Sequence, residues 1–282
     1  MKTLIKIFVL LCVIGSCTTQ KTPSEFKVIS YNIRLSGLDD IDGEHKWENR
    51  KQATINMLLQ EAPSLFGLQE ALLEQVEFVE QNLPQYTRIG VGRDDGENAG
   101  EFMAIFFLND KFNLLKHGTF WLSETPETVS MGWDAACHRT VTWVHLQEIG
   151  TGKEFYFFNT HFDHLGEIAR KESIILIINK IKEIAGEETN VIFGGDLNSE
   201  TTDDIFNPLK IYLKDARECS PITDNKGTFN GFGTVEIPEI PIVIDHFFCR
   251  NVKCLSFRTL DGDYGVPYIS DHYPIEFVFE VE

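Results

Sequence analysis

Basic side chains are scarce in this chain. It has 25 Lys and Arg against 43 Asp and Glu, which gives a formal net charge of −18, and no more than two basic residues stand side by side. Proteins that bind long nucleic acid without sequence preference neutralise many phosphates with Lys and Arg. The composition therefore argues against a dedicated duplex-binding protein. It does not exclude a nuclease, because divalent cations in an active site can offset the repulsion of a phosphate.

Long apolar runs are also missing beyond the N-terminus. No later segment approaches the roughly 20 apolar residues that span a bilayer, and the chain has no low-complexity stretch, linker or internal repeat. At the N-terminus, Lys2 and Lys6 precede a short apolar run over residues 7–14, and the small residues 15–16 follow it. A basic start, a short apolar run and small residues in this order predict an export signal.

Residues 14–17, Ile-Gly-Ser-Cys, resemble a bacterial lipobox. This resemblance implies cleavage before Cys17 and acylation of that residue, while an ordinary signal peptide is the alternative. We expect a signal peptide over residues 1–16, a lipid-anchored tether over 17–25 and one folded domain over 26–282. The protein is then exported to the cell envelope and held by the lipid in the periplasm or on the cell surface. We expect it to be a monomer.

Few cysteines are left once the signal and the lipidated residue are set aside: Cys137, Cys219, Cys249 and Cys254. Their spacing matches no common zinc pattern. An oxidising envelope permits disulfides, and the pair nearest in sequence is Cys249 with Cys254. Four buried thiols are an equally well supported reading.

Strand-like and helix-like segments alternate along the body of the chain. Apolar residues at helical spacing predict helices around 55–62 and over 166–185, and apolar or alternating runs predict strands. The predicted strands are 26–31, 64–68, 102–108, 139–148, 154–159, 190–193, 243–248 and 275–281. Asn32, Glu70, His161 and Asp196 each stand where one of these strands ends. Such positions can converge on one rim of a sheet, where ligands commonly bind.

The segment Gly194-Gly195-Asp196-Leu197-Asn198 presents a carboxylate and an amide two residues apart, after glycines that allow a sharp break of the strand. A carboxylate and an amide oxygen suit a hard divalent cation such as Mg²⁺. The alternative is a plain turn capped by Asp196 and Asn198.

Asp245 lies inside an otherwise apolar strand, and Ser270-Asp271-His272 precedes the last strand. A buried carboxylate needs a partner to offset its desolvation. The ring N–H of His272 could supply that partner, which would orient the imidazole and raise its basicity. A polar turn is the alternative for Asp271 and His272.

His161 and His164 are spaced i, i+3, which allows a zinc pair, but a single catalytic or phosphate-contacting histidine is favoured. Glu70 stands at the end of a short apolar strand, with an exposed loop position as its alternative.

Together these segments resemble the endonuclease/exonuclease/phosphatase superfamily, the deoxyribonuclease I-like proteins, in their order and approximate spacing. The matching segments are residues 31–34, 68–70, 160–161, 195–198, 244–246 and 270–272. The resemblance covers nearly the whole mature chain. It implies a four-layered α/β sandwich, with two packed, mixed and mostly antiparallel sheets flanked by helices. It also implies an essential Mg²⁺, with Mn²⁺ as a possible substitute, held by Glu70 with Asn32 and Asp271.

The resemblance assigns further roles at this site. Asp196 and Asn198 are expected to position the attacking water and the phosphate. His272, backed by Asp245, is expected to be the general base. His161 is expected to contact the phosphate or to protonate the leaving oxygen.

Glu101 lies in a segment that resembles the part of deoxyribonuclease supplying a carboxylate partner for this histidine. Arg34 stands where abasic-site enzymes usually carry an acid, which lowers the expectation of abasic-site cleavage. Both residues are counted in the site, Glu101 as catalytic and Arg34 as substrate-binding.

Substrate contacts are expected from a loop rich in aromatic and small residues. Trp121 and Trp133 could stack on a sugar, base or head group, and Arg139 could bind a phosphate with two donors. His164 is a further candidate. The alternative is that both tryptophans are core residues and that Arg139 pairs with an acid.

These observations predict a divalent-metal-dependent hydrolase of small phosphate esters, expected to be a phosphodiesterase. The alternatives are a phosphomonoesterase acting on a sugar or inositol phosphate, a secreted nuclease, and a glycan-binding lipoprotein that has lost the reaction.

Overall fold

The computed structural model describes residues 25–234 and 241–281. The predicted signal peptide and nearly all of the predicted tether lie outside the described residues. Within the described ranges, no helix has the length and apolar character needed to cross a membrane.

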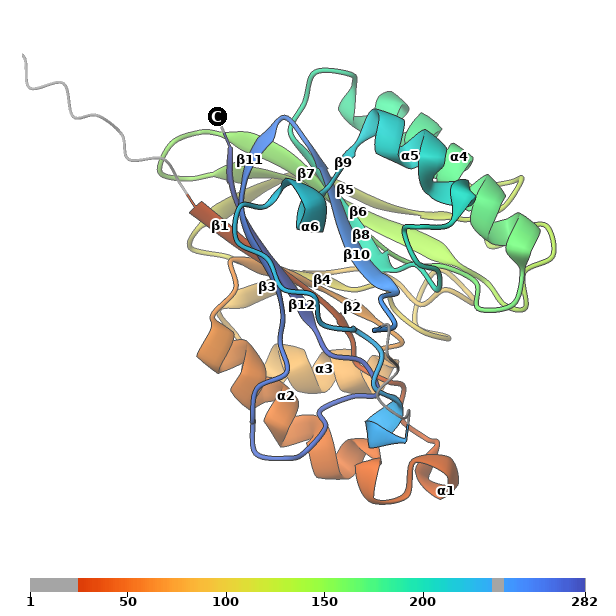
Figure 1. Cartoon of the computed structure of the whole chain (residues 1–282), viewed down its shortest axis with the longest axis vertical. Coiled ribbons are helices and arrows are strands. Elements are labelled where there is room, and N and C mark those ends of the chain that lie inside the picture. The colour runs from red at the N-terminus through yellow and green to blue at the C-terminus, as the bar shows by residue number, and fades with distance from the viewer. Residues whose placement is uncertain (1–24, 235–240, 282) are drawn as a thin grey trace, which may run out of the picture.

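Two six-stranded sheets form the body of the protein (Figure 1). The first has the order β11-β12-β1-β2-β4-β3, and its strands are antiparallel except for the parallel pair β1 and β2. In chain order its strands are β1 (Glu25–Asn32), β2 (Leu65–Gln69), β3 (Tyr86–Ile89), β4 (Ile105–Leu108), β11 (Val252–Thr259) and β12 (Ile275–Val281).

The second sheet has the order β5-β6-β7-β8-β10-β9, and only β7 and β8 run parallel. Its strands are β5 (Phe112–Trp121), β6 (Thr140–Glu148), β7 (Glu154–His161), β8 (Val191–Asp196), β9 (Lys214–Asp215) and β10 (Asp245–Arg250). Each sheet thus joins a parallel pair to antiparallel neighbours.

Helices cover the outer face of each sheet (Figure 1). Helices α2 (Trp47–Glu61) and α3 (Leu73–Asn82) pack on the first sheet, and α4 (Glu167–Ala185) and α5 (Asn207–Tyr212) pack on the second. Short helices α1 (Asp39–Asp42) and α6 (Ala216–Cys219) lie in connections. The layers run helix, sheet, sheet, helix, which confirms the predicted four-layered sandwich.

The apolar layer between the sheets follows the two-residue periodicity of the strands. In β1, Phe26 and Val28 face this layer, whereas Ile29 and Tyr31 face the helices. Side chains alternate between the faces of a sheet, so Asn32 continues the inner face. The same alternation in the other central strands brings polar residues to the inner face at one end of the sandwich. These residues are Gln69 in β2, Asn159 and His161 in β7, Asp196 in β8 and Asp245 in β10.

Several elements were not predicted from the sequence: the strands β3, β5, β9 and β11, and the helices α1, α3, α5 and α6. Strands β3, β5 and β11 lie at sheet edges. Edge strands bury little of their surface, and β5 alternates poorly because a bulge interrupts its register between Leu114 and Lys116. The predicted strand 102–108 starts only at Ile105, since Phe102 forms isolated bridges.

The predicted break of the strand at Gly194 was wrong, because β8 continues to Asp196. A Cβ on Gly194 would come within 2.4 Å of the Phe247 ring. A Cβ on Gly195 would collide with the carbonyl of Thr160. The glycines therefore allow close strand packing.

The cysteine pair nearest in sequence is not the bonded one. Cys219 and Cys254 form a disulfide, and Cys137 and Cys249 are free. Helix α6 places Cys219 beside the first sheet's edge strand β11, while Cys249 points into the apolar layer between the sheets. Tertiary packing, not sequence separation, selects the bonded pair.

A buried amide pair joins the two sheets directly. Gln69 Nε2 donates to Asn159 Oδ1 at 2.7 Å, and Asn159 Nδ2 donates to the carbonyls of Leu68 and Ala104 at 2.9 and 3.2 Å. The absence of a side chain at Gly67 makes room for this pair, because a Cβ there would lie 2.5 Å from Asn159 Oδ1. Gln69 Nε2 also donates to Ser30 Oγ at 3.1 Å, whereas Gln69 Oε1 has no hydrogen-bond partner among the described residues. The buried hydrogen bonds between the two side chains favour one arrangement of the sheets.

We expect Gly67→Ala to lower the free energy of unfolding by about 1–3 kcal/mol, the usual cost of overpacking a core. Gly150→Ala is the control, because nothing lies within 4 Å of its added Cβ; it should change stability by less than about 0.5 kcal/mol. Urea denaturation of both variants measures the difference. Equal stability of the two variants would show that the contact between Gly67 and Asn159 tolerates an added methyl group.

Candidate active site

The predicted site residues of the second sheet stand side by side on three adjacent strands. In the strand register, Asp196 lies opposite His161 on one side and opposite Asp245 on the other. Two carboxylates directly opposite each other repel. The nearby histidines reduce that repulsion, since Asp196 Oδ2 lies 3.4 Å from His161 Nε2 and 3.7 Å from His272 Nε2.

The amide of Asn32 links this row to the first sheet. Its Nδ2 donates to Asp196 Oδ2 at 2.9 Å and to Glu70 Oε1 at 3.0 Å. Its Oδ1 accepts from the backbone N–H of Arg34 at 3.0 Å. An amide whose two donors are both used by carboxylates fixes their separation, so Asn32 sets the distance between Glu70 and Asp196.

Backbone strain gathers around the same residues. Arg34, Glu70 and Asn198 adopt φ values of 57°, 61° and 48°. Asn tolerates this left-handed conformation, but Arg and Glu rarely adopt it. The hydrogen bonds described here hold them: the backbone N–H of Asn198 donates to Asp196 Oδ1 at 3.0 Å, and that of Leu35 donates to Glu70 Oε2 at 3.2 Å. Conformations of this kind cluster at functional sites.

His272 and Asp245 form the predicted pair. His272 Nδ1 lies 2.9 Å from Asp245 Oδ2, which leaves Nε2 directed toward Asp196. Burial alone would lower the pKa of His272, but the carboxylates of Asp245 and Asp196 outweigh it and raise the pKa to about 10. Burial raises the pKa of Asp196 in turn, against the opposing effect of His161. The imidazole is thus strongly basic in the absence of a bound cation.

His161 lies in a different electrostatic environment. Burial, and then the guanidinium of Arg139, lower its pKa to about 3, so its imidazole is neutral at pH 7. Asn198 Nδ2 lies 3.0 Å from His161 Nε2 and also donates to the carbonyl of Phe162 at 2.9 Å. This geometry orients the ring, and a neutral imidazole is better suited to hydrogen bonding than to giving up a proton.

Glu101 lies beside His161 but binds another partner. Its Oε2 accepts from Arg93 Nη1 at 2.7 Å and is 3.8 Å from His161 Nδ1, which has no hydrogen-bond partner among the described residues. The expected Glu101–His161 hydrogen bond is therefore not formed in this structure, because Arg93 draws the carboxylate away.

Asp271 and Arg34 complete the side of the site near Glu70. Ser270 Oγ donates to the carbonyl of Asn32 at 2.7 Å, which fastens the loop before β12 to the end of β1. Arg34 Nη1 lies 3.5 Å from Asp271 Oδ2. Burial, opposed by His272, raises the pKa of Asp271, and the charge of Glu70 raises it further.

This donor set fits a hard divalent cation. Glu70 and Asp271 offer carboxylate oxygens, the ligands that Mg²⁺ prefers. Asn32 was expected to be a further ligand, but its nitrogen faces Glu70 and its oxygen accepts from the backbone N–H of Arg34, so in this structure it positions Glu70 instead. Glu70 and Asp271 lie close enough for the charge of one to raise the pKa of the other. A cation between them would relieve that repulsion. Within the described residues, Asp196, Asp245 and His272 also place three ligand atoms within 4.8 Å of one another.

Arg139 is buried beside this cluster, with 4% of its surface exposed. Its Nε donates to Asp163 Oδ2 at 3.4 Å and its Nη2 lies 3.1 Å from His164 Nδ1, while Nη1 has no hydrogen-bond partner among the described residues. The guanidinium of Arg139 lowers the pKa of His161, so it lies near enough to act on the site. The buried, unpaired donor is suited to binding an anion.

The two tryptophans differ in their surroundings. Trp121 is buried, and its indole N–H donates to the carbonyl of Arg93 at 2.8 Å, as the core alternative expects. Trp133 is half-buried and has a φ of 48°. A stacking role stays a prediction for Trp133.

Comparison with known proteins shows the family of this chain and its fold. A model described as the Endonuclease/Exonuclease/phosphatase family matches residues 29–272. The chain belongs to this family. A crystal structure of a family member from Bacteroides vulgatus is 35% identical, covers 92% of this chain and 100% of its own, and has a TM-score of 0.86.

Two further relatives are informative. A mannosyl-6-phosphatase from Bacteroides thetaiotaomicron is 37% identical over 90% of this chain and 99% of its own, with a TM-score of 0.83. An uncharacterised protein of Acanthamoeba polyphaga mimivirus is 28% identical over 90% of this chain and all of its own length. Members of the family hydrolyse phosphate esters, which confirms the expected enzyme class at that level.

Sequence reasoning missed one residue that supports the family's site. Arg50, in α2, is buried and donates through Nη1 to the carbonyls of Ile33 and Ile269 at 2.6 and 3.1 Å. Its Nη2 donates to the carbonyl of Arg34 at 3.0 Å. These carbonyls directly follow Asn32 and directly precede Ser270. The regular helical spacing around Arg50 gave no signal that its side chain points inward.

We expect Arg50→Met to lower the free energy of unfolding by roughly 2–4 kcal/mol, since a buried acceptor left unpaired costs about 1–3 kcal/mol. Gln52→Met, on the exposed face of the same helix, should stay within about 0.5 kcal/mol of the wild type. Chemical denaturation gives both values. A stability loss in Arg50→Met no greater than in Gln52→Met would rule out a supporting role for Arg50.

Proposed function

We propose that this protein is a divalent-metal-dependent phosphatase whose substrate is a small phosphomonoester, with a sugar phosphate as the favoured class. The enzymatic activity is supported by a buried row of side chains on adjacent strands, His161, Asp196 and Asp245. His272 contacts Asp245 and faces Asp196. The carboxylates of Glu70 and Asp271 lie in the same site. The mannosyl-6-phosphatase relative supports the sugar phosphate.

Mg²⁺, with Mn²⁺ as a possible substitute, would be held by Glu70 and Asp271, with Asn32 positioning Glu70 through its amide N–H. A bound divalent cation neutralises phosphate charge and polarises the phosphoryl group. Asn32 then keeps Glu70 and Asp196 at a fixed separation, so the site is organised before the substrate arrives.

The protein's own groups would move the proton. Without a cation, the surrounding carboxylates keep His272 protonated at neutral pH. A divalent cation at Glu70 and Asp271 would offset this negative charge, and neutral His272 would then accept a proton from the attacking water at Nε2 while Asp245 stabilises the imidazolium through Nδ1. Asp196 accepts a hydrogen bond from the same water and thereby orients it. Asn198 and neutral His161 contact the phosphate oxygens.

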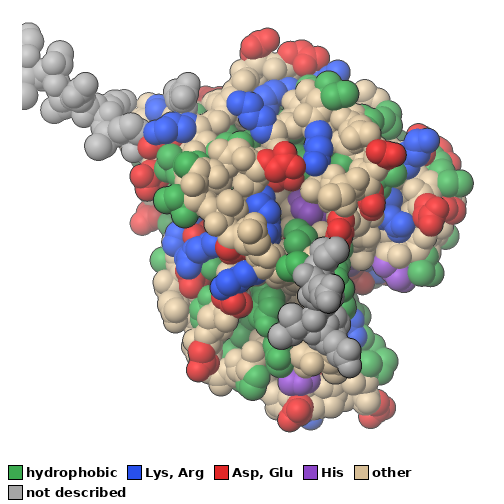
Figure 2. Space-filling model, viewed as in Figure 1, with side chains coloured by type: hydrophobic (Ala, Val, Ile, Leu, Met, Phe, Trp, Pro, Cys, Tyr) green, Lys and Arg blue, Asp and Glu red, His purple; other side chains and the backbone are tan. Residues whose placement is uncertain are grey.

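The free donor of Arg139 suits the oxygens of a monoester. A phosphomonoester carries more negative charge than a diester, and it offers three non-bridging oxygens. Arg139 supplies a buried cation with a free donor, and a guanidinium matches the geometry of phosphate oxygens. On the face seen in Figure 2, Lys and Arg are interspersed with Asp and Glu, and the acidic net charge disfavours a long polyanion.

A cavity lined by a neighbour of His272 has room for a group of sugar size. Phe229 packs edge-on against the His272 ring, with centroids 5.0 Å apart, and lines a cavity of about 610 Å³. Tyr268, Tyr273 and Asn230 also line it. Ligand pockets are commonly about 300–1,000 Å³. Aromatic faces with scattered polar groups suit a hexose.

Hexose 6-phosphates should be hydrolysed faster than bis(p-nitrophenyl) phosphate and dinucleotides, with turnover abolished by chelator and restored by Mg²⁺. Steady-state kinetics on this panel checks the expectation. His272→Ala should lower kcat by about 10²–10⁴-fold, the usual contribution of general acid–base catalysis.

The outcomes separate the alternatives. Preference for diesters would support the phosphodiesterase expectation over the monoesterase. Turnover indifferent to chelator, or no turnover together with glycan binding, would overturn the metal-dependent enzyme. The lipid anchor at Cys17, the envelope location and the monomeric state stay predictions.

Mg²⁺ should also raise Tm, because a ligand that binds only the folded state stabilises it, by about 2.7 kcal/mol at 100 times Kd. Glu70→Gln should lose this Mg²⁺-dependent rise. Glu77→Gln, an exposed carboxylate on α3, should keep it. Thermal unfolding with and without Mg²⁺ gives the comparison, and an unchanged rise in Glu70→Gln would remove Glu70 from the metal site.

A further inference from the structure

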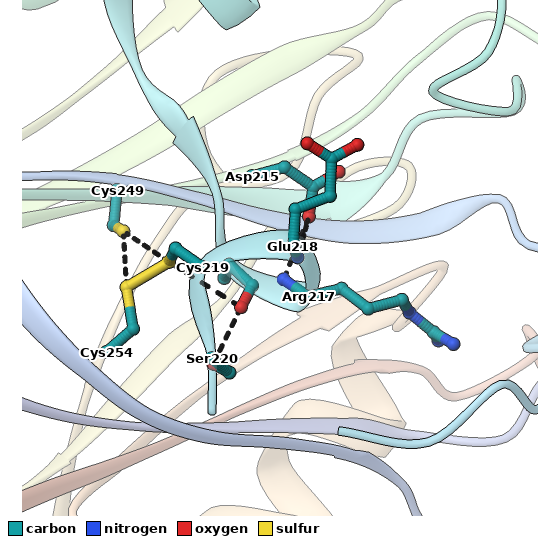
Figure 3. The surroundings of a disulfide bond; sticks show 8 residues. Asp215, Arg217, Glu218, Cys219, Ser220, Cys249 and Cys254 are labelled. Atoms are coloured by element: carbon teal, nitrogen blue, oxygen red, sulfur yellow. Dashed lines mark hydrogen bonds between the residues drawn. A yellow bond between two sulfur atoms is a disulfide. The ribbon is translucent and has the colours of Figure 1, made fainter. Parts of the chain in front are cut away.

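Three cysteines meet at the far edge of the sandwich, although their sequence spacing matches no zinc pattern. Cys219 ends α6, Cys249 lies in β10 and Cys254 lies in β11. Beside the Cys219–Cys254 disulfide, the sulfur of Cys249 lies 3.6 Å from that of Cys254 and 3.9 Å from that of Cys219 (Figure 3). Three elements thus each contribute one sulfur to a single cluster.

The position of Cys249 does not suit thiol–disulfide exchange. Exchange requires a thiolate that attacks one sulfur of the disulfide, in line with the bond that breaks. The Cys249 sulfur is nearly equidistant from both bonded sulfurs, so it lies beside the bond and not along its extension. Burial also raises the pKa of Cys249 to about 12, which keeps the group as a thiol at neutral pH.

The same triangle suits three thiolates around one metal ion. Zn²⁺ binds sulfur at about 2.3 Å in tetrahedral geometry, which separates neighbouring sulfurs by about 3.8 Å. Two of the three separations here are already 3.6 and 3.9 Å. Reduction would move the third pair apart to ordinary van der Waals contact. The Cα atoms of Cys219 and Cys254 are 6.0 Å apart, so both side chains can face a common ion.

We propose that reduction of the Cys219–Cys254 bond converts this cluster into a three-thiolate site for a soft d¹⁰ cation such as Zn²⁺. A dithiol supplies two electrons and two protons and leaves as its disulfide, or a phosphine supplies two electrons and one water supplies two protons and the oxygen of the phosphine oxide. The S–S bond breaks, and Cys219 and Cys254 each take one proton. Binding then displaces the protons from the three thiols, because a coordinating thiol is deprotonated outright.

The surroundings permit access and balance charge. Cys219 and Cys254 are half-buried, so an ion would enter from their side and water would fill the fourth position. Burial raises the pKa of Cys249, and the opposite charges of Lys214 and Asp215 act on it in opposing directions, so the bound cation itself would offset most of the thiolate charge. The ion would join α6, β10 and β11, the elements that the disulfide otherwise holds together.

The test is an anaerobic titration of the phosphine-reduced full chain with Cd²⁺, followed through the ultraviolet thiolate-to-Cd²⁺ absorption. This band reports metal–sulfur bonds alone, so a carboxylate site such as that around Glu70 stays silent. The reduced wild type should show a band that saturates at one equivalent, and the oxidised protein should not. Cd²⁺ should also restore the Tm that reduction lowers.

Cys249→Ser should lose the band, and Cys254→Ser, at a half-buried position, should lose it too if the first variant folds poorly. Cys137→Ser is the matched control and should keep it. Cys137 lies in a separate group with Asp163 and His164. A band that survives Cys249→Ser, disappears in Cys137→Ser, or is equally strong in the oxidised wild type would overturn the proposal.

Discussion

The amide of Asn32 donates to a carboxylate from each sheet, and the site depends on this arrangement. Asn32 reaches Glu70, which follows β2 of its own sheet, and Asp196, which ends β8 of the other sheet. Both acceptors are carboxylates that would otherwise repel. Below them, the buried Gln69–Asn159 pair joins the same two sheets. The relative position of the sheets therefore sets the geometry of the site. A change in the packing between the sheets would change the separation of Glu70 and Asp196.

The site holds more carboxylates than cations. This excess of negative charge affects the protonation of its two histidines differently. His272 lies among Asp245, Asp196 and Asp271, which make it strongly basic. His161, which faces Asp196 from β7, is kept neutral by burial and by Arg139. Both imidazoles face Asp196. They differ in protonation because other carboxylates surround His272, whereas Arg139 lies near His161. Of the two, only His272 holds a proton at neutral pH in this structure.

The two ends of the inner layer serve different purposes. At one end the inner faces of the central strands become polar and form the candidate active site. At the other end the edge strand β11 and helix α6 are joined by the disulfide, with the third cysteine directly beside it. A long apolar layer of aromatic side chains separates them. Chemistry at the cysteines can therefore change without contacting the residues that would bind phosphate.

The sequence alone determined the central strands, the helix α4 and most of the site, because strand periodicity and strand-end polarity are local signals. Asn32, His161, Asp196 and Asp245 could be placed at or near strand ends from their neighbours in the chain, and family resemblance ordered them. Only the tertiary structure decided the contacts between residues far apart in the chain. Glu101 pairs with Arg93, and Cys219 forms a disulfide with Cys254. Arg50 donates to the loops that follow Asn32 and precede Ser270. Edge strands escaped prediction for the same reason: half-exposed residues carry little apolar pattern, and their pairing is set by neighbours far away in the chain.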